Sequence, residues 1–109
     1  MKAKDRKDDA AKAAFLRRGA ALWPVARGTV SLVRKPCGRS RCGACASGRG
    51  HPALIFTCRV DGRGRCLHVR VRDEAKMRKA VENGRRLEAL LAEEGVRLVE
   101  SLRAEADAD

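Results

Sequence analysis

Small and apolar residues recur at helical spacing in the last third of the chain. From Asp73 to about Ala104 the sequence is rich in good helix formers, and one side of the expected helix holds Met77, Ala80, Val81, Gly84, Leu87, Leu91, Leu98 and Leu102. Asp73 can cap the first turn, and Glu74 would complement the helix dipole. The pattern therefore predicts one long amphipathic helix over this segment.

A helix of about 30 residues is about 45 Å long, which exceeds what a small sheet can cover. Its distal half is therefore expected to fold back, near Gly95, or to pack against another helix. The first helix of the chain and a helix from a second copy are both candidates for that cover. Gly84 and Gly95 each cost about 1 kcal/mol relative to alanine, so neither serves helix strength.

The middle of the chain alternates with the period of a strand. Residues 28–34 (GTVSLVR) are β-branched and predict one strand. Residues 53–60 (ALIFTCRV) and 65–71 (RCLHVRV) flank the turn sequence DGRG, which predicts a β-hairpin. Alternation gives the hairpin one largely apolar face, made of Leu54, Phe56, Cys58 and Val60 with Leu67, Val69 and Val71, and places Cys66, His68 and Arg70 on the other face.

The beginning of the chain predicts a short helix. Asp8 or Asp9 could cap it, and Pro24 would end it after about Leu22, because the residue before a proline avoids the α region. Its apolar residues are expected to contact the core: Phe15, Leu22 and Trp23.

These elements define an α+β fold: a small three-stranded antiparallel sheet with a cysteine-rich knuckle, followed by a long C-terminal α-helix and preceded by the short N-terminal helix. The expected organisation has three parts. Residues 1–26 form a basic N-terminal segment, residues 27–72 hold the knuckle and hairpin, and residues 73–109 form the long helix with an acidic tail.

The segment from Cys37 to His51, CGRSRCGACASGRGH, has almost no apolar residue to bury, so its ordering requires another source of free energy. Its spacing, C-x4-C-x2-C-x5-H, predicts a tetrahedral Zn2+ site with the ligands Cys37, Cys42, Cys45 and His51. Cys58 or Cys66 could replace His51 as the fourth ligand, and His68 is a weaker alternative. Two other interpretations remain open, a loop of reduced thiols and a dithiol formed by Cys42 and Cys45.

The positive charge is concentrated around this segment. Of the net charge of +11, residues 27–72 carry eleven basic residues against Asp61 alone, whereas residues 73–109 carry a net charge of −3. Such a distribution is typical of nucleic-acid-binding proteins. DNA and RNA are both possible partners, and the expected contacts are Arg34, Lys35, Arg39, Arg41, Arg49, Arg63 and Arg65.

Catalysis finds no support in the sequence, because nothing in it resembles a phosphate loop, a nucleophile elbow or a paired-carboxylate site. No secretory signal and no apolar run long enough for a membrane span is recognisable. Clustered cysteines without such a signal predict a cytoplasmic protein. The missing catalytic motifs predict that it is a binding module and not an enzyme.

Residues from about 28 to 102 resemble a small uncharacterised prokaryotic family that is often found near transposases and other mobile elements. The family pattern runs G-[ST]-x3-R, CGK-x2-C-x-CA-x-G, HGPY, a hairpin with DGK-x-R, and a long helix with E-N-Y-R-x-L. The matching pieces here are Gly28-Thr29 to Arg34, Cys37-Gly38-Arg39, Cys42, Cys45-Ala46, Gly48, His51-Pro52, Asp61-Gly62-Arg63 and Glu82-Asn83-Gly84-Arg85. The resemblance implies the architecture described above and a mobile-element setting.

The sequence thus predicts a basic, zinc-stabilised nucleic-acid-binding accessory protein of mobile elements. The alternative is a protein-interaction module whose long helix pairs with a second copy or with a transposase-like partner. An arginine patch that is continuous across the folded sheet would favour the first function. An apolar stripe left exposed on the long helix would favour the second.

Overall fold

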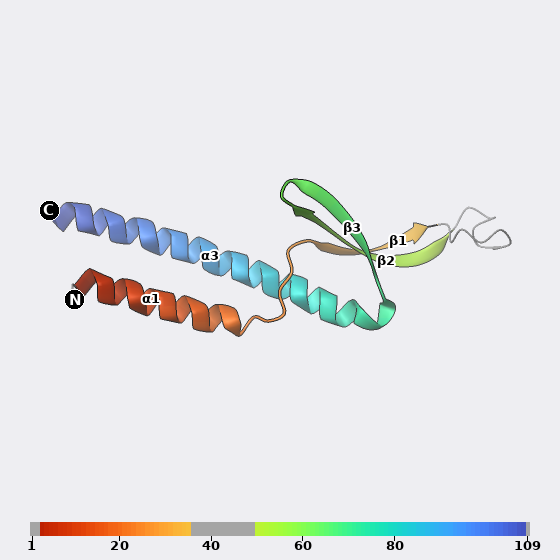
Figure 1. Cartoon of the computed structure of the whole chain (residues 1–109), viewed down its shortest axis with the longest axis horizontal. Helices are drawn as coiled ribbons and strands as arrows, with labels where there is room; N and C mark the ends of the chain where they lie inside the picture. Colours follow the sequence, from red (N-terminus) through yellow and green to blue (C-terminus); the bar gives the residue numbers. More distant parts are fainter. Residues whose placement is uncertain (1–2, 36–49, 109) are drawn as a thin grey trace. The chain divides into compact units, whose positions relative to one another are not determined.

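The computed structural model of the 109-residue chain describes residues 3–35 and 50–108 (Figure 1). The chain begins with helix α1 (Ala3–Ala20), which is followed by the strands β1 (Thr29–Lys35), β2 (His51–Val60) and β3 (Arg63–Val69). A 3-10 turn, η1 (Val71–Asp73), then leads into the long helix α3 (Glu74–Ala108). The predicted α+β class, with a three-stranded antiparallel sheet and a long C-terminal helix, is confirmed.

The sheet has the order β1-β2-β3, and its register places Leu67 and Val69 on the face of Leu54 and Phe56, as predicted. Val71, which was predicted on the same face, lies beyond the end of β3 and is 80% exposed. One row across the sheet joins Leu32, Leu54 and Val69. The neighbouring row on the same face joins Val30, Phe56 and Leu67, because directly paired residues share a face. Leu54 and Val69 are buried.

The hairpin turn is tighter than the sequence indicated. Only Asp61 and Gly62 connect β2 to β3, and both have positive φ angles, 53° and 79°. Such a two-residue turn matches the twist of the strands that it joins. Strand β1 pairs with β2 from Lys35 to Thr29, and Thr29 lies opposite Thr57. Beyond Thr57 only β2 and β3 are paired, so residues 58–65 form a two-stranded extension. We call this extension the hairpin tip.

The chain divides into two compact units. The sheet unit comprises Ala26–Val81, and the helical unit comprises Met1–Val25 with Glu82–Asp109. The first residues of α3 therefore belong to the sheet unit, where Ala80 and Val81 are buried together with Leu54 and Val69. The backbone N–H of Ala26 donates a hydrogen bond of 3.0 Å to the Ala80 carbonyl, which ties the start of this unit to the helix.

Gly28 lies where no side chain fits. A Cβ atom at this position would be 2.5 Å from the Thr57 carbonyl oxygen and 2.6 Å from the Phe56 ring. Gly28→Ala is therefore expected to destabilise the protein by about 2–3 kcal/mol, because the neighbouring strand must move. Gly64→Ala is the matched control, since a Cβ at Gly64 would meet nothing within 4 Å. Thermal or urea unfolding measures both, and equal midpoints for the two variants would contradict the prediction.

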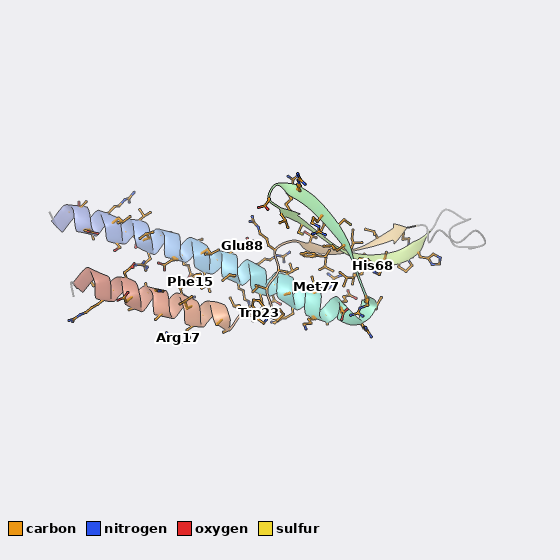
Figure 2. The ribbon with its side chains drawn as sticks, in the orientation of Figure 1. Phe15, Arg17, Trp23, His68, Met77 and Glu88 are labelled. Atoms are coloured by element: carbon orange, nitrogen blue, oxygen red, sulfur yellow. The ribbon has the colours of Figure 1, made fainter. Side chains whose placement is uncertain are left out.

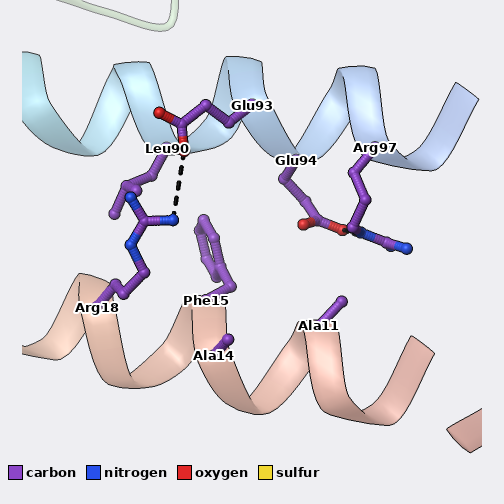
Figure 3. Close-up of a pocket in the computed structure, with 8 residues that line it drawn as sticks. All are labelled: Ala11, Ala14, Phe15, Arg18, Leu90, Glu93, Glu94 and Arg97. Atoms are coloured by element: carbon purple, nitrogen blue, oxygen red, sulfur yellow. Dashed lines mark hydrogen bonds and ion pairs between the residues drawn. The ribbon is translucent and has the colours of Figure 1, made fainter. Parts of the chain in front are cut away.

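The helical unit pairs α1 with the distal part of α3 in antiparallel orientation. Asp8 accepts an ion-paired hydrogen bond of 3.3 Å from Arg97 of α3, and Arg18 donates one of 3.3 Å to Glu93. Phe15 lies between the two helices, near Leu90, which is buried (Figures 2 and 3). A further link comes from buried Asn83, whose Nδ2 donates to the Pro24 carbonyl at 3.0 Å.

The structure corrects several expectations about the helices. Helix α1 begins at Ala3, so Asp8 and Asp9 lie inside it and cap nothing; the preceding residues are themselves good helix formers. Helix α3 is continuous through Gly95, so the predicted reversal there is wrong. The first helix of the chain provides the cover on one side.

Two predictions about apolar residues were also wrong. Trp23 is not in the core, because its side chain is 77% exposed in the segment that follows α1. Leu90 is buried, although it was not among the residues predicted on the apolar side of the long helix. Leu91, Leu98 and Leu102, which were predicted on that side, are exposed. A single covering helix contacts only one narrow face of α3, which leaves the adjacent face open. Among the described residues, no helix has the length and apolar character needed to cross a membrane.

Candidate nucleic-acid interface and metal ligands

The hairpin tip carries three arginines around one tight turn. Arg63 and Arg65 are paired with Val60 and Cys58, so they share a face of β3 about 7 Å apart along the strand. Arg59 is paired with Gly64 and projects from the opposite face. All three arginines are exposed, and Arg59 Nη1 reaches the Gly62 carbonyl at 3.5 Å. The tip therefore presents positive charge on both faces of a two-stranded ribbon.

Carboxylates do not neutralise this charge. The sheet unit has three acidic residues, Asp61, Asp73 and Glu74. Asp73 binds Arg70 at 2.9 Å and Glu74 binds Arg78 at 2.8 Å. Within residues 3–35 and 50–108, no ion pair joins Arg34, Arg63 or Arg65 to an acidic residue, so these guanidinium groups are available to an anionic partner.

The two units differ sharply in net charge. The sheet unit has 14 basic and 3 acidic residues, a net charge of +11, whereas the helical unit has 11 of each and is neutral. The entire net charge of the protein is therefore carried by the sheet unit. A positive field that is confined to one unit attracts polyanions to that unit alone.

The other predicted contacts lie elsewhere. Arg34 and Lys35 are at the end of β1, and Arg34 is paired with Pro52. Pro52 is six residues along β2 from Cys58, the partner of Arg65, which corresponds to about 20 Å. The described arginines of the sheet thus form two groups at opposite ends of it. Arg39, Arg41 and Arg49 lie outside the described residues.

Only one of the predicted zinc ligands lies within the described residues. Cys37, Cys42 and Cys45 fall outside them, and His51 is the first residue of β2, paired with Lys35 at the end of β1. Lys35, which lies two residues before the predicted zinc segment, and His51, which is the last residue of that segment, are therefore neighbours in the sheet. Three thiolates and an imidazole are a donor set that suits zinc, and the pairing of Lys35 with His51 is compatible with a single compact site.

The alternative fourth ligands are poorly placed for such a site. Cys58 is seven residues along β2 from His51, about 23 Å away, and Cys66 is paired with Thr57, which is six residues or about 20 Å along β2 from His51. His68 is paired with Ile55, four residues along β2 from His51. Both described cysteines are free thiols, and the described part of the chain contains no group of three potential metal ligands.

A groove of about 230 Å³ also lies between α1 and α3 in the helical unit (Figure 3). Its two acidic residues are already paired, Glu93 with Arg18 and Glu94 with Arg97, whose Nε donates to Glu94 at 2.8 Å. That hydrogen bond lowers the pKa of the Glu94 carboxyl and raises the pKa of Arg97. The groove otherwise presents apolar side chains, those of Ala11, Ala14, Phe15 and Leu90, so its chemistry is that of helix packing.

Sequence reasoning missed Arg59 as a candidate contact. Its position two residues before the DGRG turn was the signal that could have found it, since alternation across a two-residue turn places it on the face opposite Arg63 and Arg65. No family model matches this chain, and comparison with curated proteins and with solved structures found no match.

Proposed function

We propose that the sheet unit binds nucleic acid, mainly through phosphate contacts. The observation that carries this proposal is the division of charge, +11 on the sheet unit and zero on the helical unit. Contacts between basic side chains and phosphates supply most of the affinity in such complexes. The exposed tip arginines Arg59, Arg63 and Arg65 are the first contacts, and Arg34 with Lys35 is a second group.

The shape of the hairpin tip favours duplex DNA over duplex RNA. The major groove of B-form DNA admits a two-stranded β-ribbon, whereas the major groove of A-form RNA is too deep and narrow for side chains to read. Beyond Thr57 the hairpin is such a ribbon, with arginines on both faces. We therefore propose that the tip enters the DNA major groove, with its arginines facing the flanking phosphates.

Zinc has a structural role in this proposal. Cys37, Cys42, Cys45 and His51 are the proposed ligands, and the metal would stabilise the connection between β1 and β2. An accessory role beside a transposase or another mobile element rests on the motif resemblance alone. The exposed leucines of α3 favour a second candidate function, pairing of the helical unit with a partner helix.

Fluorescence anisotropy with a labelled duplex of about 20 base pairs tests nucleic-acid binding. If about five phosphates are neutralised, log K against log salt concentration is expected to fall with a slope between about −4 and −5. Competition with duplex RNA of the same sequence tests the preference for DNA. An absence of binding to either duplex at low salt and micromolar protein would refute the proposed function.

A further inference from the structure

The helical unit is a layer of two helices with an open apolar side. Gly19 of α1 faces Leu87 of α3, since a Cβ at Gly19 would lie 3.6 Å from Leu87 Cδ1. Leu16 lies about one turn before Gly19, and Leu91 lies about one turn after Leu87. Each step also turns the side chain by about 40–60° around its own helix, and because the helices are antiparallel, these two rotations lead to the same side of the layer. Leu16 and Leu91 therefore occupy the same side, and they are 57% and 55% exposed.

Two more leucines of α3 continue this side. Leu98 is seven residues after Leu91, and Leu102 is eleven residues after Leu91. This helical spacing places the three leucines on one side of α3. Leu98 is 45% exposed and Leu102 is 55% exposed. We define the leucine face by its four members: Leu16, Leu91, Leu98 and Leu102.

Between Leu91 and Leu102, no charged side chain borders the leucines on the side that faces away from α1; Glu94, on the side toward α1, is paired with Arg97. The intervening positions on this side are Ala92, Gly95 and Val99, although 36% of the chain is charged. Gly95 is notable because a Cβ there would meet nothing within 4 Å. Within the described chain, then, no contact requires a glycine at this position, although it weakens the helix.

We propose that a second copy of this chain covers the leucine face, so that two helical units form an antiparallel four-helix bundle. Isologous pairing about a two-fold axis midway between Gly95 and Leu98 places Leu98 of each copy opposite Gly95 of the other. The same axis places Leu91 opposite Leu102. A large residue then meets a small one in each central layer, and Gly95 has a function that a single chain does not give it.

The charges of the two helices complement each other within each copy. Helix α1 has six basic and three acidic residues, a net charge of +3. The part of α3 in the helical unit, residues 82–108, has four basic and seven acidic residues, a net charge of −3. The two-fold axis sets α3 against α3 and α1 against α1, so the apolar contacts of the leucine face, and not charge attraction between the copies, hold the bundle together. The sheet unit has a net charge of +11 and repels the sheet unit of a second copy. The neutral helical unit is therefore the part of the chain that is suited to self-association.

Dimerisation would place two basic sheet units in one particle. A nucleic acid that spans both units is then bound bivalently, which raises the apparent affinity without any new contact. This inference stands on the helical unit and does not depend on the proposed function of the sheet unit. The two can therefore fail separately.

Sedimentation velocity of the full chain at tens of micromolar tests the inference. The wild type is expected to be a dimer, and Leu98→Asp is expected to raise its dissociation constant at least about 30-fold, as removal of a central interface residue does. Val96→Asp is the matched control, because Val96 is 58% exposed on another side of the same helix. It should leave the dimer intact. Circular dichroism verifies that both variants keep their helices.

Gly95→Leu provides a second, independent variant. Leucine improves helix propensity, and its Cβ would meet nothing within 4 Å in the described chain, so the variant is expected to fold; circular dichroism verifies this. Its side chain would block the close approach of Leu98 from the second copy. Loss of the dimer in Gly95→Leu and Leu98→Asp, with retention in Val96→Asp, supports the inference. A monomeric wild type, or an oligomer that Leu98→Asp or Gly95→Leu leaves intact, overturns it.

Discussion

Replacing Cys42 with serine is expected to abolish zinc binding and to destabilise the protein more than Gly28→Ala does. The wild type should contain one zinc ion per chain, held by Cys37, Cys42, Cys45 and His51. Binding of structural zinc contributes roughly 10–16 kcal/mol in small peptides at neutral pH. The segment that holds these ligands has almost no apolar side chains, so no other source compensates for the ordering of its backbone.

Elemental analysis and thermal unfolding measure this effect. The matched control is Cys66→Ser, because Cys66 is a free, exposed thiol paired with Thr57. It should keep its zinc, and its melting temperature should remain near that of the wild type. A chelator should lower the melting temperature of the wild type but not that of Cys42→Ser. Metal-free wild type from zinc-replete cells, or equal zinc loss in both serine variants, would contradict the prediction.

Reversing the charge of the hairpin tip is expected to weaken DNA binding at least about a hundredfold at low salt. The variant replaces Arg59, Arg63 and Arg65 with glutamate. It removes three phosphate contacts and places three negative charges against the duplex. The slope of log K against log salt should become shallower by about 0.9 for each phosphate that is no longer neutralised. All three side chains are exposed and the tip has no buried apolar residue, so the fold should be retained.

A second triple variant separates this local effect from the effect of total charge. Arg17, Arg85 and Arg103 are arginines of the helical unit, and their replacement by glutamate changes the net charge by the same amount. If the tip is the interface, this control should lose only a few-fold in affinity. Equal losses for the two variants would show that the tip contributes no specific contact, even if the protein binds DNA.

Local patterns determined the elements of this protein. The alternation of Leu54, Phe56 and Cys58 predicted a strand and its core face, and the register of β2 with β3 confirms it. The run of helix formers after Asp73 predicted α3 from its first residue. These signals depend only on the period of side chains along a strand or helix, which the sequence states directly. The concentration of positive charge in the middle of the chain was visible for the same reason.

Only the tertiary structure decided which elements meet and which faces remain open. The periodicity of α3 could not distinguish the buried Leu90 from the exposed Leu91, because their fates depend on where α1 lies. Trp23 is exposed because the helical unit has two helices and no third element covers it within the described chain. The boundary between the basic and the neutral unit falls inside one continuous helix, after Val81, where no composition shift or linker marks it. Such features arise from contacts between residues that are distant in the chain, and periodicity carries no information about those contacts.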